Sequence, residues 1–158
     1  MYIADGAGSG TWTTLGSKIL QRSFSRTLLH TSLTTALPSD GTTPQSTEGD
    51  AIFSVSFTPQ SASSKIYIRA NVLVQNGGSG NASIALFRST SCLASNYTTV
   101  NSQPTPLSID FSENSPGTSA VTYSLRGGGS TGAITLNGSA SVDLGPTVGS
   151  TFFIEEVL

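Results

Sequence analysis

The feature that most constrains the fold is a series of short runs in which apolar and polar residues alternate one by one. The longest run places Ile66, Ile68, Ala70, Val72 and Val74 at every second position. Shorter runs of this kind lie at 53–57, 84–87, 107–111 and 121–126, with further apolar residues at 134–136 and 152–157. Successive side chains of a strand point to opposite faces, so a period of two indicates strands.

Stretches rich in Gly, Asn and Pro separate these runs, at 76–81, 113–117, 127–130 and 137–138. Such residues favour hairpin turns and loops. No segment carries a clear amphipathic helix. The sequence therefore predicts an all-β protein, an antiparallel β-sandwich or jelly roll of eight or nine short strands.

The N-terminal part differs in composition from the rest of the chain. Four of residues 1–16 are glycine, and we expect an extended arm there, anchored by Trp12 and Leu15. Residues 18–37 mix apolar side chains with many hydroxyls, which compete with a helical backbone, so they predict two strands or one long bent strand. Residues 38–50 predict a loop. The expected organisation is an arm at 1–16 and a β-sandwich domain at 17–158.

The charge balance argues against several classes of partner. Charged residues make up 10 % of the 158, and 7 Lys and Arg face 9 Asp and Glu, which argues against nucleic-acid binding. No apolar run approaches the length of about 20 residues that spans a bilayer. Residues 1–6 have neither the positive start nor the apolar stretch of a signal peptide. Serine and threonine supply 48 of the residues, giving a polar surface with little charge.

The sequence predicts no catalytic residues, no cofactor and no metal site. One histidine, His30, and one cysteine, Cys92, are too few for a protein-only metal site. Residues 127–132 match both the nucleophile-elbow and the dinucleotide-binding strings, but each needs a following helix, and 133–136 predict a strand. We instead expect a turn whose glycines adopt positive φ. We expect Cys92 to be a small buried residue near a strand end.

The remaining charged residues have structural interpretations. Glu155 and Glu156 are adjacent and therefore point to opposite faces of a strand, so they form no acid–base pair. We expect Asp110 and Glu113 to be solvated carboxylates in loops. Arginines 69, 88 and 126 lie within or at the end of alternating runs, where salt bridges are expected.

Several strands carry large apolar side chains on both faces, although each sheet of a sandwich has one inner face. Surplus apolar surface of this kind usually covers a loop or meets another chain, and the second is favoured here because low charge does little to keep copies apart. A self-association interface is therefore expected. Its candidate residues are Tyr67, Arg69, Leu73, Phe152 and Phe153.

Four segments together resemble a family of small β-domains in the virion proteins of tailed bacteriophages. They are residues 4–12, residues 40–49, residues 58–66 running on to 85–88, and residues 115–123 running on to 137–139. The resemblance covers about residues 4–140. It implies a trimeric, jelly-roll-like knob without a catalytic centre, made in the bacterial cytoplasm and assembled into the particle.

In tail fibres such a domain usually ends a long chain, whereas here Met1 lies close to the domain. The first hypothesis is therefore a homotrimeric capsid decoration (cement) protein on the virion surface. Its arm, with Tyr2, Ile3, Trp12 and Leu15, would bind the major capsid protein by adding to a sheet edge. The alternative is a tail-fibre tip that recognises a host surface receptor through loops 76–81, 94–105 and 113–118, with Tyr97 stacking on sugar. A depolymerase-type enzyme is a third, more distant hypothesis.

Overall fold

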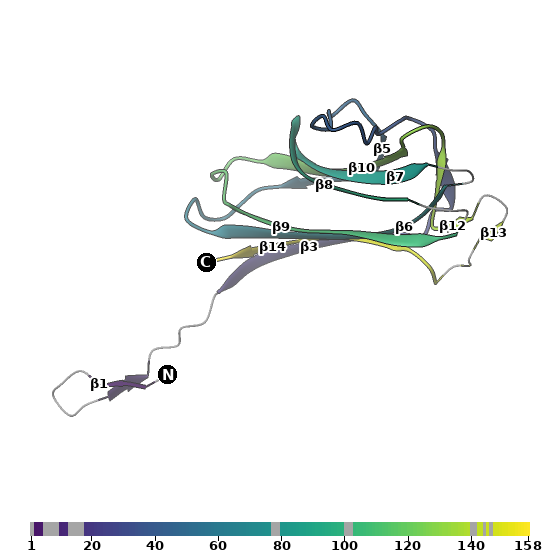
Figure 1. Ribbon diagram of the computed structural model, residues 1–158. Coiled ribbons are helices and arrows are strands. Elements are labelled where there is room, and N and C mark those ends of the chain that lie inside the picture. Colours follow the sequence, from purple (N-terminus) through teal and green to yellow (C-terminus); the bar gives the residue numbers. More distant parts are fainter. Residues whose placement is uncertain are drawn as a thin grey trace.

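The computed structural model describes residues 2–4, 10–12, 18–76, 80–99, 103–139, 142–143, 145 and 147–158, with the backbone alone described at 2–4, 10–12 and 76. The secondary structure of these residues consists of strands, and each pair of neighbouring strands is antiparallel. Two sheets lie face to face (Figure 1). The predicted all-β antiparallel sandwich is therefore confirmed.

The larger sheet has six strands, arranged around the long strand β6 (Lys65–Asn76). One edge of β6 pairs with β9 (Thr105–Asn114). Its other edge pairs first with β14 (Ser150–Val157) and then with β11 (Ile134–Leu136). β3 (Ile19–Thr27) lies outside β14, and β4 (Thr31–Leu33) lies outside β11. The predicted two strands within 18–37 are confirmed as β3 and β4.

The smaller sheet has four strands, in the order β5 (Asp50–Phe57), β10 (Val121–Gly129), β7 (Asn81–Arg88) and β8 (Ser91–Thr99). Two short pairs complete the described strands. β12 (Gly138–Ser139) pairs with β13 (Val142–Asp143), and β1 (Tyr2–Ala4) pairs with β2 (Gly10–Trp12).

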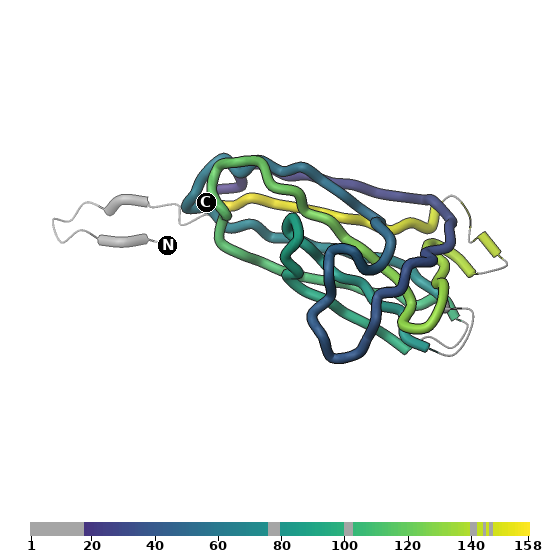
Figure 2. Tube along the Cα trace, turned by 90° about the horizontal axis from the view of Figure 1, so that it is seen from above, coloured from purple at the N-terminus to yellow at the C-terminus, as the bar shows by residue number. Residues whose placement is uncertain are grey.

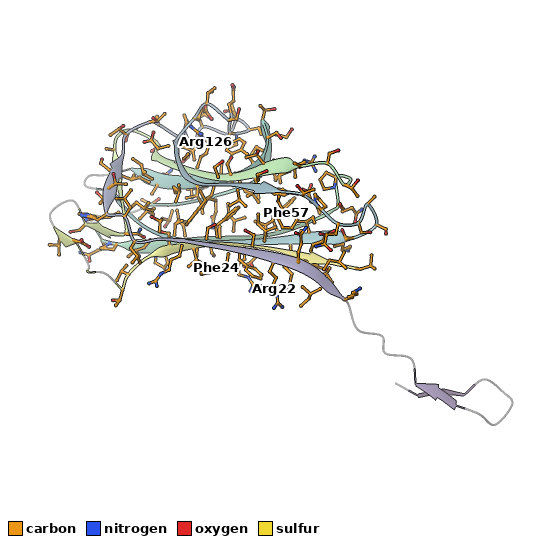
Figure 3. The ribbon with its side chains drawn as sticks, turned by 180° about the vertical axis from the view of Figure 1, so that it is seen from behind. Arg22, Phe24, Phe57 and Arg126 are labelled. Carbon is orange, nitrogen blue, oxygen red and sulfur yellow. The ribbon has the colours of Figure 1, made fainter. Side chains whose placement is uncertain are left out.

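The core lies between the two sheets, because each strand sends every second side chain inward. Phe53 of β5 stacks on Phe152 of β14, with ring centroids 5.6 Å apart. Phe57 meets the edge of Tyr123 at 6.3 Å, and Figure 3 shows Phe57 between the layers. The inward positions of β6 are those that the alternating pattern predicts: Ile66, Ile68, Ala70, Val72 and Val74.

A smaller cluster lies on the outer surface of the smaller sheet. Leu37 is 1 % exposed and packs on Ala85 and Phe87, with half-buried Cys92 beside them. Leu37 belongs to the segment 34–49, which crosses over this sheet (dark blue in Figures 1 and 2). The predicted loop at 38–50 is confirmed up to residue 49, and residue 50 begins β5.

β8 differs from the sequence prediction, which assigned residues 94–105 to a loop. Residues 91–99 are a strand that pairs with β7 along eight positions. Its sequence contains few apolar residues, because β8 lies at the sheet edge and many of its side chains meet solvent. A strand with little burial has no strong alternating pattern.

Candidate interaction surfaces

The outer face of the larger sheet, which points away from the smaller sheet, carries two rows of side chains across its strands. One row runs from Phe24 on β3 through Phe153 and Arg69 to Asp110 on β9. The second row runs from Arg22 through Glu155 to Tyr67. We call these seven residues the outer face. Figure 3 shows Arg22 and Phe24 pointing from β3 away from the core.

The outer face combines exposed aromatic rings with charges that are already paired. Phe24 is 64 % exposed and Tyr67 is 43 % exposed. The Arg22 Nε lies 2.5 Å from a Glu155 carboxylate oxygen, and the Arg69 Nε lies 2.6 Å from an Asp110 oxygen. A hollow of about 320 Å³ lies among Tyr67, Phe153 and these ion pairs. A second apolar surface can therefore approach without leaving an unpaired charge.

The five predicted interface residues lie in three different parts of the structure. Tyr67, Arg69 and Phe153 lie together on the outer face. Leu73 is half-buried at the far end of β6, where its carbonyl accepts a hydrogen bond from the Asn137 amide. Phe152 is 1 % exposed within the core, so its proposed place in an interface is wrong. It alternates with Phe153 and therefore faces inward.

The arm residues are only partly within the described structure. Tyr2 pairs with Trp12 and Ile3 pairs with Thr11 in the β1–β2 ladder, and nothing more is described of their side chains. The expected extended arm is thus a two-stranded pair at these positions. Leu15 lies outside the described residues. The capsid-binding role of the arm and the domain boundary at residue 16 stay predictions.

A polar pocket of about 330 Å³ lies on the opposite side of the molecule, between the 37–44 loop and strands β7 and β8. Tyr97, a residue that is 61 % exposed, forms one wall. The rest of the lining is mostly small and polar, and includes Asp40, Asn81, Ser83 and Asn96. The sequence predicts that Tyr97 stacks on sugar from a loop, but Tyr97 lies on strand β8. The sequence does not predict that the 37–44 loop contributes to the same pocket.

Glu156 is a buried carboxylate at the end of the core, and its surroundings are structural. It is 0 % exposed and accepts hydrogen bonds from the Gln60 and Ser61 amides at 2.9 Å and from the Ser64 hydroxyl at 2.6 Å. Gln21 Nε2 donates to it at 2.7 Å. Burial alone would raise the pKa of Glu156, but these hydrogen bonds together hold that pKa below its ordinary value. The prediction that Glu155 and Glu156 point to opposite faces is confirmed.

Glu113 contradicts the prediction of a solvated loop carboxylate. It lies in β9, with a side chain only 13 % exposed, and pairs with Arg88. The Tyr123 hydroxyl donates to its other oxygen at 2.6 Å. Burial, and then this hydrogen bond, raise the pKa of Tyr123 far above its ordinary value, so the phenol stays a neutral donor. Asp110, by contrast, is exposed as predicted, although it lies in β9 and not in a loop.

The expected salt bridges form at two of the three arginines. Arg69 and Arg88 pair with Asp110 and Glu113. Arg126 instead donates to two backbone carbonyls, those of Glu48 at 2.7 Å and Gly49 at 2.6 Å. Its guanidinium therefore holds the end of the 34–49 segment over the smaller sheet, in the region that Figure 3 labels.

The glycine-rich segment 127–132 is the end of β10 and the turn to β11, and a strand follows it as predicted. The predicted reason for its glycines is wrong, because none of its four glycines has a positive φ between 20° and 160°. Close approach of neighbouring atoms requires three of them, Gly127, Gly128 and Gly129, whereas a Cβ on Gly132 would meet nothing within 4 Å. A Cβ on Gly128 would lie 2.3 Å from the Thr35 carbonyl oxygen, and one on Gly129 would lie 2.1 Å from the Gly132 oxygen.

The lone cysteine and histidine both have packing roles. Burial raises the pKa of the Cys92 thiol, which agrees with the predicted small, unreactive residue near a strand end. The His30 ring contacts the Ser139 carbonyl at 2.9 Å through Nε2. Within the described ranges, no three His, Cys, Asp or Glu side chains gather where they could hold a metal ion.

No protein-family model matches the chain, and the search of curated proteins finds no match. In the part of the chain that the structure describes, no helix has the length and apolar character needed to cross a membrane.

Proposed function

We propose that this protein is a structural component of a bacteriophage virion, a homotrimeric, jelly-roll-like capsid decoration (cement) protein without enzymatic activity. The resemblance of its sequence to tailed-phage β-domains supports the proposal that the protein belongs to a virion. The single observation that carries the proposal is the outer face, where exposed Phe24 and Tyr67 lie among charges that are already paired. Covering aromatic surface of this kind with a partner removes it from water, which is favourable.

Self-association serves a decoration protein because it multiplies weak contacts. Each protomer of a symmetric oligomer would present one N-terminal arm to the major capsid protein. Binding of the first arm raises the effective concentration of the others, so the assembly binds far more tightly than one protomer. The Tyr2–Ala4 and Gly10–Trp12 strands offer main-chain groups that can extend a sheet edge on the shell.

The direct test is cosedimentation of the purified protein with empty capsids of the phage that encodes it. We expect binding by the full chain and loss of binding when residues 1–16 are removed. The control is a Trp12→Ala variant, which keeps the arm backbone and should weaken the binding only partly. A protein that is monomeric at micromolar concentration and binds no capsid would contradict the proposal.

The alternative function, a tail-fibre tip that binds a host receptor, is favoured by one observation, the polar pocket beside Tyr97. The number of copies per virion separates the two functions. Shell decoration requires many copies, set by capsid symmetry, whereas a tail position requires few. Quantitative mass spectrometry of purified virions gives this number.

A further inference from the structure

The pocket beside Tyr97 is built on a pre-organised part of the fold. Leu37 is buried against Ala85 and Phe87, and its amide donates to the Gly129 carbonyl at 3.1 Å. Two residues further on, the hydroxyls of Ser39 and Ser83 lie 2.9 Å apart. The loop is thus fastened to β7 and β10 at its start. Its following residues Asp40, Gly41, Thr42 and Pro44 line the pocket together with Tyr97.

The backbone of Tyr97 is held in place by the neighbouring residue, Asn96. The Asn96 side chain donates to the Ser108 carbonyl of β9 at 2.9 Å and accepts from the Tyr97 amide at 2.9 Å. β8 also pairs with β7, where Ser83 lies directly opposite Tyr97. The backbone beneath the ring is therefore fixed, while 61 % of the residue stays open to solvent. A pre-formed aromatic surface loses little entropy when a ligand covers it.

Hydrogen-bonding groups surround the ring at positions that a ligand can reach. One oxygen of Asp40 accepts from the Thr42 amide at 3.0 Å and from its hydroxyl at 2.6 Å, and these bonds fix the carboxylate. Asn81 accepts from the Thr99 hydroxyl at 3.0 Å through Oδ1. Among the described residues, no other residue donates a hydrogen bond to the second oxygen of Asp40, and the Nδ2 group of Asn81 has no hydrogen-bond partner. One can accept and the other can donate.

The charge of the lining restricts the class of ligand. It contains no lysine or arginine, and its charged residue is Asp40. The side-chain and backbone hydrogen bonds from Thr42 lower the pKa of Asp40, so the carboxylate is ionised at neutral pH. Anionic ligands are repelled, and purely apolar ligands would leave the amide and carboxylate groups without water or partner.

We propose that this pocket binds a neutral saccharide, with one sugar ring stacked on Tyr97 and its hydroxyls bonded to Asp40 and Asn81. The C–H face of a pyranose is apolar and slightly positive, which suits the negative face of an aromatic ring. Each sugar hydroxyl both donates and accepts, as the lining requires. The volume of about 330 Å³ is at the lower end of the range of about 300–1,000 Å³ for ligand pockets, and suits one or two sugar rings.

Saturation-transfer NMR tests the inference, with glucose, galactose, mannose and N-acetylglucosamine as neutral probes and N-acetylneuraminic acid as the anionic comparison. We expect at least one neutral sugar to receive saturation at millimolar concentration, and the anionic sugar to receive none. Tyr97→Ala should weaken that binding about tenfold, as expected for the loss of one aromatic contact. Tyr97→Phe, which keeps the ring, should retain it.

Matched variants separate loss of the site from loss of the fold. Asp40→Asn changes an exposed loop side chain and should weaken binding without changing the urea midpoint of unfolding. Tyr67→Ala removes an exposed tyrosine from the other sheet and should leave sugar binding unchanged. Absence of transfer to every neutral sugar, or transfer that Tyr97→Ala leaves intact, would overturn the inference.

The site does not depend on virion assembly. The same saturation-transfer NMR experiment on a Phe24→Asp variant, which changes the outer face, is therefore expected to give the wild-type result. Failure of capsid binding with intact sugar binding would count against the decoration role alone. Failure of sugar binding with intact capsid binding would count against the saccharide site alone.

Discussion

At the scale of single residues, Glu156 shows how a charge can be stabilised inside an apolar core. Its carboxylate lies on the same side of β14 as Phe152 and Ile154, yet it receives donors from Gln21 and from the 60–64 turn. The carboxylate therefore connects β3, β14 and the turn before β6. Its removal affects three segments that are distant in sequence.

We expect Glu156→Gln to lower the free energy of unfolding by about 2–4 kcal/mol. The variant places an amide NH₂ where an oxygen now accepts from backbone donors, so two donors face each other. Urea denaturation measures the loss. The control is Glu155→Gln, which removes a surface ion pair with Arg22 and should cost about 0–1 kcal/mol. Equal effects of the two substitutions would contradict the structural role of Glu156.

Because of the Glu156 carboxylate, we expect the stability of the fold to depend on pH in the acid range. The pKa of Glu156 is lowered in the folded state, and the pKa of Asp50 is lowered as well, first by the Thr35 hydroxyl. The unfolded chain thus binds protons more readily than the folded protein. The stability from these groups is present above the ordinary carboxyl pKa and is lost as pH falls through the folded values.

Urea midpoints measured from neutral pH into the acid range should therefore stay level at first and then fall. The difference between wild type and Glu156→Gln should shrink over that acid range. A midpoint that rises on acidification would show that the sign is wrong.

At the scale of elements, the 34–49 segment and strand β10 depend on each other. Arg126 donates to the Glu48 and Gly49 carbonyls, and Asp50 accepts from the Thr34 and Thr35 amides. Gly128 lets the Thr35–Leu37 backbone lie directly on β10. The loop is therefore a fastened cover over the smaller sheet.

We expect Gly128→Ala to destabilise the protein by about 1–3 kcal/mol, because the new methyl group displaces the Thr35 carbonyl. Thermal unfolding measures this effect. Gly132→Ala is the matched control, since its Cβ would meet nothing within 4 Å and its φ is unstrained. A Gly128→Ala variant as stable as Gly132→Ala would show that the loop does not press on β10.

The elements with strong burial could be predicted from the sequence, and those with weak burial could not. β6 was evident because its five inward apolar residues occur at every second position. β8 was missed because an edge strand with exposed side chains needs no apolar alternation. The pattern placed Glu155 and Glu156 on opposite faces. Which of them faces the core depends on pairing with β6, and no local signal contains that information.

The candidate sites, like the strands, could be predicted only in part from the sequence. Tyr67, Arg69 and Phe153 were chosen as residues of a second, outward face, and they do lie together. Phe152 was chosen wrongly, because adjacent aromatic residues do not reveal which one points inward. The Tyr97 pocket joins residues 37–44 with residues 81–84 and 95–97. Contacts between such distant segments arise from tertiary packing, which alternation alone does not specify.

At the scale of the whole molecule, the two large surfaces of the sandwich differ in character. The loop of residues 34–49 covers part of the smaller sheet, whereas the outer face of the larger sheet exposes Phe24 and Tyr67. An asymmetry of this kind is expected when one face meets solvent and the other meets a copy of the chain.

Analytical ultracentrifugation should therefore find a concentration-dependent oligomer. Phe24→Asp places an unpaired charge on the outer face and should weaken association at least about tenfold, since burying such a charge is costly. Tyr97→Asp makes the same kind of change on the other sheet and should leave the oligomer intact. Equal association by both variants and wild type would exclude the outer face as the interface.

The position of β14 has a consequence for how the chain is made. β14 lies between β3 and β6, so β3 has no neighbour in its sheet until residues 150–157 exist. Ribosomes add about 5–20 residues per second, so β3 waits on the order of ten seconds after its own synthesis. During translation its bare edge is open to pairing with other nascent chains, and the Ser, Gln and Arg side chains along it reduce that hazard until the last strand emerges.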